Sequence, residues 1–267
     1  GSLAQGLETL LQEGLIEEYN SSDDIAYGFS HERIRRLVYD RLNYFQRTPL
    51  HHQIAELLCE AKLPENSNTC RRAAWHFERA GEPLRALACQ VRALNQESAR
   101  SCEAFPLYTG DPAPFVPAAQ IEQELHHISE KFAHLRQTEK DAQVIESLKN
   151  ELILIRGRLA LFYGNWEEGA ELLGALSAAG REREHSVMVH ACYLLAVSAL
   201  YQQSASQAER YTMAGMRLLQ KDHNPALAAQ FQRLRGACFC LRGEYEKSSY
   251  YYLEAIDALK ALPDTPA

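Results

Sequence analysis

The stretch Gly157–Leu173, GRLALFYGNWEEGAELL, occurs a second time in altered form as Gly236–Leu253, GACFCLRGEYEKSSYYYL. In both stretches two glycines lie seven residues apart, and an aromatic residue follows the second glycine by two positions. A glycine tolerates the positive φ that often ends a helix, and a small residue lets a second helix cross closely. Each stretch therefore predicts a helical hairpin, in which one helix ends at a glycine and the next returns antiparallel.

Two weaker copies of the pattern extend it along the chain. One is Tyr193–Tyr211, in which Ala196 takes the place of the first glycine, 39 residues after Gly157 and 40 before Gly236. The other is Ala74–Ala86, further upstream. Neither helix of such a pair can bury its apolar stripe alone, so successive pairs are expected to stack around one elongated core.

The last copy resembles the tetratricopeptide repeat. The resemblance rests on its small, aromatic and alanine positions, which are Gly236, Phe239, Gly243, Tyr245, Tyr252 and Ala255. The copy departs from that repeat in three ways: the period is near 40 rather than about 34, Ser248 stands where alanine is usual, and the terminal proline is missing. The resemblance implies a mostly α fold, a right-handed superhelix of helical hairpins with a concave groove.

Composition limits the class of protein. The 267 residues are 46% hydrophobic and 24% charged, as in ordinary globular proteins, and no apolar run approaches the roughly 18 residues of a membrane span. Seven scattered cysteines, an odd number, favour reduced thiols and a cytoplasmic location. A net charge of −7 argues against direct nucleic-acid binding. The leading Gly1-Ser2 indicates a fragment of a longer protein.

The N-terminal sixty residues follow a different pattern. Residues 3–14 predict a helix, and 15–19 and 25–29 predict two strands joined by a turn at 20–24. Ser30 is expected to cap a further helix, whose apolar and basic positions continue as far as Phe45. A helix followed by a two-stranded wing is the closing part of a winged-helix unit.

The next helix is expected to begin at Thr48, as its cap, with Pro49 in the first helical position. Its apolar stripe is predicted to comprise Leu50, Ile54, Leu57 and Leu58. Beyond a loop at 64–68, helices are predicted near 69–80, 83–103, 118–136, 139–163, 166–178, 182–203, 205–221, 225–242 and 244–262.

A second resemblance rests on Gly14–Glu17, Tyr27–Leu42 and Leu50–Ala55. These stretches are similar to the winged-helix end of the ATPase module in signal-transducing ATPases with numerous domains, such as the large bacterial regulators of the maltose-activator and antibiotic-regulator types. In those families a tetratricopeptide-like superhelix follows the module. The resemblance implies an ATP- or ADP-bound parent protein that is released by an inducer or partner to self-associate and activate transcription.

The same resemblance gives His31 a role. In related cell-death ATPases a histidine just after the wing strand contacts the phosphate of bound ADP, and His31 occupies the similar place. The other interpretation is that His31 only packs on the wing in the first turn of its helix. This chain contains no G-x-x-x-x-G-K-[ST] phosphate loop, so any nucleotide would be bound in the parent protein, through an ATPase domain upstream.

The expected organisation has four parts: 1–62 is the winged-helix end, 63–104 the first hairpin, 105–117 a proline-rich linker or insertion, and 118–267 the repeat array. Four prolines exclude a helix from 105–117. The aromatic side chains of Phe105, Tyr108 and Phe115 predict that this segment packs against the array. Whether it is a hinge between two sub-arrays or an insertion stays open.

Catalytic and metal-binding motifs are not found in the sequence. Neighbours on a helix diverge by about 100°, so His51 and His52 do not chelate through one face, and Cys238 and Cys240 point apart. We therefore expect no enzyme active site, no metal and no cofactor of the chain's own.

Recognition is the expected chemistry. Matching the repeats places Arg158, His190, Tyr193, Gln230 and Arg233 along the concave wall, where they could hold an anionic or polyhydroxylated ligand or an acidic peptide. The alternative is that these side chains bond within the protein. The sequence thus favours a non-catalytic sensor or scaffold region of a multidomain regulator, and the competing hypothesis is a protein–protein adaptor without a small-molecule inducer.

Overall fold

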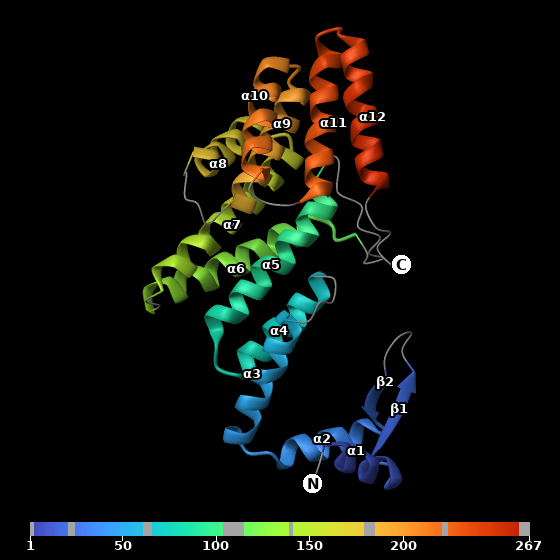
Figure 1. Ribbon diagram of the computed structural model, residues 1–267. Coiled ribbons are helices and arrows are strands. Elements are labelled where there is room, and N and C mark those ends of the chain that lie inside the picture. Colours follow the sequence, from blue (N-terminus) through green and yellow to red (C-terminus); the bar gives the residue numbers. More distant parts are fainter. Residues whose placement is uncertain are drawn as a thin grey trace.

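The computed structural model describes residues 3–20, 25–60, 66–103, 115–138, 141–178, 185–220 and 224–261. These residues are mostly helical and include a small two-stranded antiparallel sheet (Figure 1). The elements are α1 (Leu3–Gln12), β1 (Ile16–Asn20), β2 (Ile25–Phe29), α2 (Glu32–Arg41), α3 (Tyr44–Glu60), α4 (Ser67–Arg79), α5 (Pro83–Cys102), α6 (Ala118–Thr138), α7 (Ala142–Phe162), α8 (Trp166–Ala178), α9 (His185–Tyr201), α10 (Ala205–Leu219), α11 (Pro225–Leu241) and α12 (Tyr245–Lys260).

The predicted N-terminal helix and both wing strands are confirmed. Gly14 takes a φ of +66° at the end of α1, and β1 pairs with β2 so that Ile16 lies opposite Phe29. The predicted cap at Ser30 is wrong, because the residue before α2 is His31. The Ser30 hydroxyl instead donates to the carbonyl of Gly14 at 2.6 Å, which ties the end of the wing to the end of α1.

The boundary between α2 and α3 also differs from the prediction. Helix α2 ends at Arg41, and α3 begins at Tyr44 rather than at Thr48. Asn43 provides the cap: the Gln46 amide donates to Asn43 Oδ1 at 3.0 Å, and the Asn43 amide donates to Gln46 Oε1 at 3.1 Å. This reciprocal capping box starts the helix one turn early and leaves Pro49 inside it.

The buried face of α3 is not the predicted leucine stripe. Leu50, Ile54 and Leu57 are exposed, whereas His51 and Ala55 are buried and Leu58 packs beside them. Helix α4 packs on this face of α3, and the small side chain of Ala55 permits a close approach. His51 can be buried there because both of its ring nitrogens have hydrogen-bond partners.

The hairpin pattern is confirmed in the pairs α4–α5, α7–α8, α9–α10 and α11–α12. In each pair the first helix closes with the same 6→1 backbone bond, which runs from Glu82 to Phe77, Asn165 to Ala160, Ser204 to Ala199 and Glu244 to Phe239, at 2.8–3.0 Å. A 5→2 bond accompanies it in every pair, completing a Schellman motif. The last three closures follow one another at the spacing that the sequence predicts.

Glycine serves two different purposes in these pairs. Gly164 and Gly243 take φ values of +81° and +75°, and the equivalent residue of the third pair, Gln203, takes +57° without being glycine. Gly157 permits a close crossing, because a Cβ atom there would lie 2.6 Å from Leu173. At Gly236 it would lie 3.0 Å from Tyr252, the position equivalent to Leu173.

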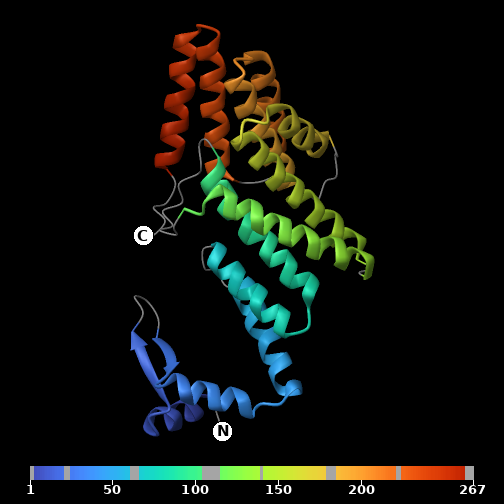
Figure 2. The same cartoon turned by 180° about the vertical axis from the view of Figure 1, so that it is seen from behind.

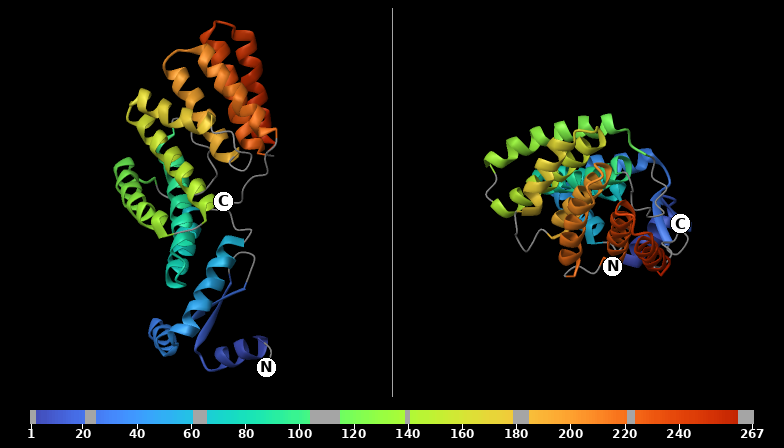
Figure 3. Two further views of the ribbon diagram at one scale, coloured as in Figure 1. Left: turned by 90° about the vertical axis from the view of Figure 1, so that its left-hand side faces the viewer. Right: turned by 90° about the horizontal axis from the view of Figure 1, so that it is seen from above.

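Successive pairs lie side by side along the molecule, from the wing at one end to α11 and α12 at the other (Figures 1 and 2). Helix α8 contacts α9, α10 contacts α11, and the first helices α7, α9 and α11 contact one another in turn. Helices α5, α6 and α7 share one apolar cluster, and α7 to α11 share another. Figure 3 shows the same succession from the side and from above.

The proline-rich stretch falls largely outside the described residues, including Phe105 and Tyr108. The predicted packing of Phe115 is wrong, because this side chain is 70% exposed. Val116 makes the contact instead, packing on the α5–α6–α7 cluster and donating its amide to Ser101 Oγ at 3.2 Å.

Candidate functional site

Arg158 on α7 is buried at the centre of a polar network, with 1% of its surface exposed. Its Nε donates to Glu103 Oε1 at 2.8 Å, and one terminal nitrogen donates to Asn95 Oδ1 at 2.9 Å and to Ser98 Oγ at 2.6 Å. Asn95 and Ser98 are three residues apart on α5, so they face the same way, and Glu103 directly follows the helix. Arg158, which the repeat pattern places near the concave wall, is thus buried and bonded within the protein.

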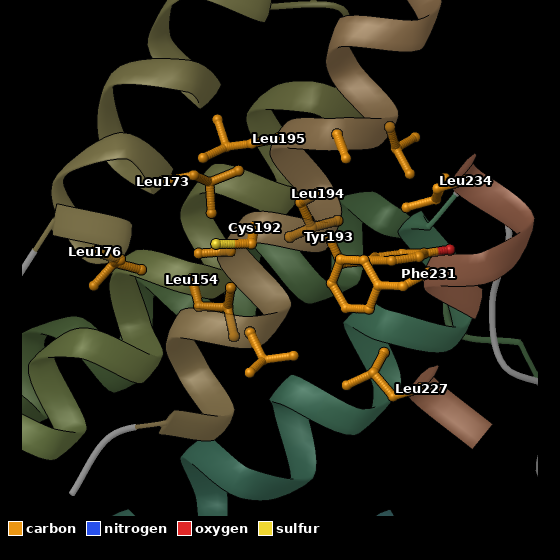
Figure 4. Packing of buried hydrophobic residues seen from close by; sticks show 14 of the residues in the cluster. Leu154, Leu173, Leu176, Cys192, Tyr193, Leu194, Leu195, Leu227, Phe231 and Leu234 are labelled. Atoms are coloured by element: carbon orange, nitrogen blue, oxygen red, sulfur yellow. The ribbon is translucent and has the colours of Figure 1, made fainter. Parts of the chain in front are cut away.

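Tyr193 and Arg233 join α9 to α11. The guanidinium of Arg233 donates to the Tyr193 hydroxyl at 3.1 Å. The Tyr193 ring is buried edge-to-face against Phe231, at 5.9 Å between centroids (Figure 4). Burial raises the pKa of Tyr193 to about 12, so the hydroxyl stays protonated and can donate as well as accept.

His190 and Gln230 lie one turn away from this pair on the same two helices. His190 is half-buried, and its Nδ1–H donates to the Ser186 carbonyl at 2.8 Å. Burial lowers the pKa of His190, and the charge of Arg158 lowers it further, so the ring is neutral at pH 7. Gln230 is 6% exposed, and its buried Oε1 has no hydrogen-bond partner among the residues that the structure describes.

Together these side chains form what we call the inner polar cluster, contributed by α5, α7, α9 and α11: Glu103, Arg158, His190, Tyr193, Gln230 and Arg233. The Glu103 carboxylate acts on the pKa of both His190 and Tyr193, so it is the shared anion of the group. Three of the five predicted groove residues, Arg158, His190 and Tyr193, thus interact with one carboxylate that sequence reasoning missed. Only His190 and Arg233 of the five are half-buried; the other three are buried.

Two open grooves lie between helices elsewhere in the described residues. One, of about 270 Å³, is bordered by α6, α7 and α8 and includes His126, Arg156 and Tyr163. The other, of about 140 Å³, is bordered by α8, α9 and α10 and includes Trp166, Gln202 and Tyr211. Neither groove contains a residue of the inner polar cluster.

His31 precedes α2 in extended conformation, with φ −144° and ψ 134°, and its exposed imidazole makes no capping hydrogen bond. Its expected phosphate contact stays a prediction. Among the described residues, no three His, Cys, Asp or Glu side chains are grouped so that they could hold a metal ion. None of the described helices combines the length and the apolar character needed to cross a bilayer.

Compared with known proteins, the chain matches no protein-family model and no curated protein sequence.

Proposed function

We propose that the chain is a non-catalytic recognition scaffold, in which tetratricopeptide-like hairpins form a right-handed superhelix that binds an inducer or a partner. The repeated helix closures and the contacts among α7, α9 and α11 support this proposal. In such an array the first helix of each pair lines the concave side. The inner polar cluster is built on these first helices together with α5.

The observation that carries the proposal is the unsatisfied acceptor of Gln230. A buried amide oxygen without a partner costs about 1–3 kcal/mol, which a ligand hydroxyl or N–H could recover on binding. Gln230 and Arg233 are three residues apart on α11, and His190 and Tyr193 are three apart on α9. This arrangement favours a polyhydroxylated ligand with an anionic group, or an acidic peptide, over an apolar ligand.

We also propose that the scaffold belongs to a signal-transducing ATPase that regulates transcription. The order of the elements supports this: a helix, a two-stranded wing and two helices precede the hairpin pairs, as the resemblance implies. In that setting ATP or ADP would be bound by the parent protein, and His31 would report the nucleotide phosphate. The chain itself would act by binding, in the cytoplasm, next to the ATPase domain.

Thermal shift measurements against sugars, sugar phosphates, nucleotides and acidic peptides test the binding proposal. A ligand of the proposed site should raise the melting temperature of the wild type in a saturable way. Arg233→Gln should lose this increase, whereas the matched variant Arg217→Gln, at an exposed arginine of α10, should keep it. A panel in which nothing raises the melting temperature, or in which Arg233→Gln responds like the wild type, contradicts the proposal.

The adaptor function is a second candidate, favoured by the outer face of α12. Tyr245, Leu253 and Ile256 are exposed on this face, next to the exposed Leu259. Exposed apolar rows of this kind are typical of protein contacts. Binding of a peptide that Ile256→Glu abolishes and Arg233→Gln leaves unchanged would favour the adaptor over the groove.

A further inference from the structure

A group of basic and aromatic side chains links α2, α3 and α4 through hydrogen bonds. These three helices directly follow the wing along the chain (Figure 1). Helix α4 presents four of them at helical spacing on one face, α3 adds two and α2 adds one. We call this group the arginine junction: Tyr39, Arg47, His51, Arg72, Trp75, His76 and Arg79.

A line of hydrogen bonds connects the three helices. Arg79 donates to the Tyr39 hydroxyl at 3.4 Å, this hydroxyl lies 2.9 Å from His51 Nε2, and His51 Nδ1 lies 2.9 Å from His76 Nδ1. Two ring nitrogens can share a hydrogen bond only if one donates and the other accepts. The assignment that satisfies every group has Tyr39 donating to His51 Nε2 and His51 Nδ1–H donating to His76 Nδ1, which leaves the Nε2–H of the half-buried His76 for another acceptor.

Stacking holds two of the arginines in place. The guanidinium carbon of Arg47 lies 4.3 Å from the centroid of the Tyr39 ring, and that of Arg79 lies 4.2 Å from the ring of Trp75. Stacking uses the face of a guanidinium and leaves its N–H edges available for an anion. The Nε of Arg47 is buried, and no group in the described part of the chain hydrogen-bonds to it.

Within the described residues, Arg47, Arg72 and Arg79 form no ion pair, whereas Arg71, Arg85, Arg158 and Arg242 each pair with a glutamate. The charges of Arg47 and Arg79 lower the pKa of His51, after burial, and Arg72 and Arg79 contribute to lowering that of His76. An uncompensated positive site is unexpected in a chain of net charge −7.

We propose that the arginine junction binds a small oxyanion of the phosphate class. The N–H edges of Arg47 and Arg79 and the Nε2–H of His76 are the donors, and Arg72 adds charge at the rim. Trp75, which is 45% exposed, borders the site. Arginine forks match the paired oxygens of phosphate, and charge-assisted bonds of this type are the strong ones. This site is separate from the inner polar cluster, so it does not depend on the function proposed above.

Fluorescence of Trp75 tests the proposal directly. The chain has two tryptophans, so Trp166→Phe leaves Trp75 as the only reporter. Inorganic phosphate is titrated at constant ionic strength, with sodium chloride as the compensating salt. We expect a saturable change in emission, weakened at least about tenfold by Arg47→Gln/Arg79→Gln, as the loss of one charge-assisted bond implies.

Two further variants keep the test decisive if the double variant folds poorly. Arg72→Gln changes an exposed side chain and should weaken binding by a smaller factor. The matched pair Arg33→Gln/Arg217→Gln removes two exposed arginines elsewhere and should bind like the wild type. An O-phosphoserine titration shows the source of the group: tighter binding than phosphate indicates an esterified phosphate, and weaker binding indicates the free ion. Emission that changes linearly, or equally in both double variants, overturns the proposal.

Discussion

The arginine junction and the inner polar cluster use the same residue types in opposite ways. Arg158 is buried and bonded to Glu103, Asn95 and Ser98, so its charge is neutralised within the protein. Arg47 and Arg79 are stacked on aromatic rings at the edge of the molecule and have no carboxylate partner among the described residues. The comparison teaches that an arginine important for folding can be recognised by the carboxylate and polar groups bonded to it. An arginine available for a ligand can be recognised because no carboxylate is bonded to it.

The largest expected effect is on the inner polar cluster: the comparison fails if Arg158 can be replaced with little loss in the free energy of unfolding. Arg158→Met leaves the Glu103 carboxylate buried without its cation, so we expect a loss of about 3–5 kcal/mol in the free energy of unfolding. Urea denaturation measures it. Arg156→Met, at an exposed neighbour on the same helix, should cost less than about 0.5 kcal/mol. Adding Glu103→Gln to Arg158→Met should recover part of the lost stability. Equal stability of Arg158→Met and Arg156→Met would contradict the structural role of Arg158.

The close crossing of α7 and α8, next to the inner polar cluster, gives the next largest expected effect on stability. A Cβ at Gly157 would lie 2.6 Å from Leu173, so Gly157→Ala should cost about 1–3 kcal/mol by overpacking. Gly174 in α8 is the matched control, because a Cβ there would have no described atom within 4 Å apart from its chain neighbours and its own helix backbone. Gly174→Ala should stabilise by about 0.5–1 kcal/mol. A lower urea midpoint for Gly157→Ala and a higher one for Gly174→Ala, each relative to the wild type, would confirm the close crossing at Gly157. Midpoints that shift in the same direction would argue against it.

The junction side of the comparison should respond to pH. The folded chain holds the pKa of His51 and His76 below the ordinary 6.5, by burial first and then by neighbouring positive charge. The unfolded chain therefore binds protons below about pH 6.5 that the folded chain does not, and stability falls as the pH drops through this range.

The urea midpoint measured from pH 8 to pH 5 should consequently fall less in His51→Gln/His76→Gln than in the wild type. The groups that face these rings are Tyr39, Arg47, Arg72 and Arg79, and none of them is an acid that would reverse the sign. His134→Gln, at an exposed histidine of α6, should keep the wild-type slope. Identical slopes in all three proteins would show that the junction does not control this loss.

The smallest expected effect is on the reaction of the cysteine thiols with a reagent, which reports on the packing of both the junction helices and the hairpin pairs. All seven cysteines are free, and only Cys59 on α3 and Cys240 on α11 are exposed. Burial raises the pKa of Cys89 to about 12 and that of Cys192 to about 11. A thiol reagent should therefore modify two cysteines quickly in the native chain and the rest only after denaturation. Rapid reaction of five or more native thiols would indicate looser packing than the structure has.

Much of the array could be predicted because its boundaries depend on local residues. Gly164 and Gly243 end helices through positive φ, and Pro83 and Pro225 begin them, so the predicted helices agree with the structure to within a few residues. The start of α3 could not be predicted in this way. Thr48-Pro49 and Asn43-Gln46 are both valid signals for the start of a helix. Only the structure shows that the helix begins at the earlier one, where Asn43 and Gln46 form the capping box.

The sites were less accessible to sequence reasoning, because their partners are distant in the chain. Glu103 lies 55 residues before Arg158, and His51 lies 25 before His76. The expected divergence of His51 and His52 is confirmed, since His51 contacts His76 while His52 contacts Glu82 at 2.6 Å. Their divergence follows from helix geometry, but which helix each ring meets is decided by tertiary packing.

The position of Tyr39 has a mechanical consequence. Helix α1, the two strands and α2 pack on one another, and Tyr39 of α2 contacts His51 of α3 and Arg79 of α4. Because Tyr39 lies on α2 and bonds to both α3 and α4, an anion that repositioned its ring would act on the wing side and on the hairpin side of the molecule at once.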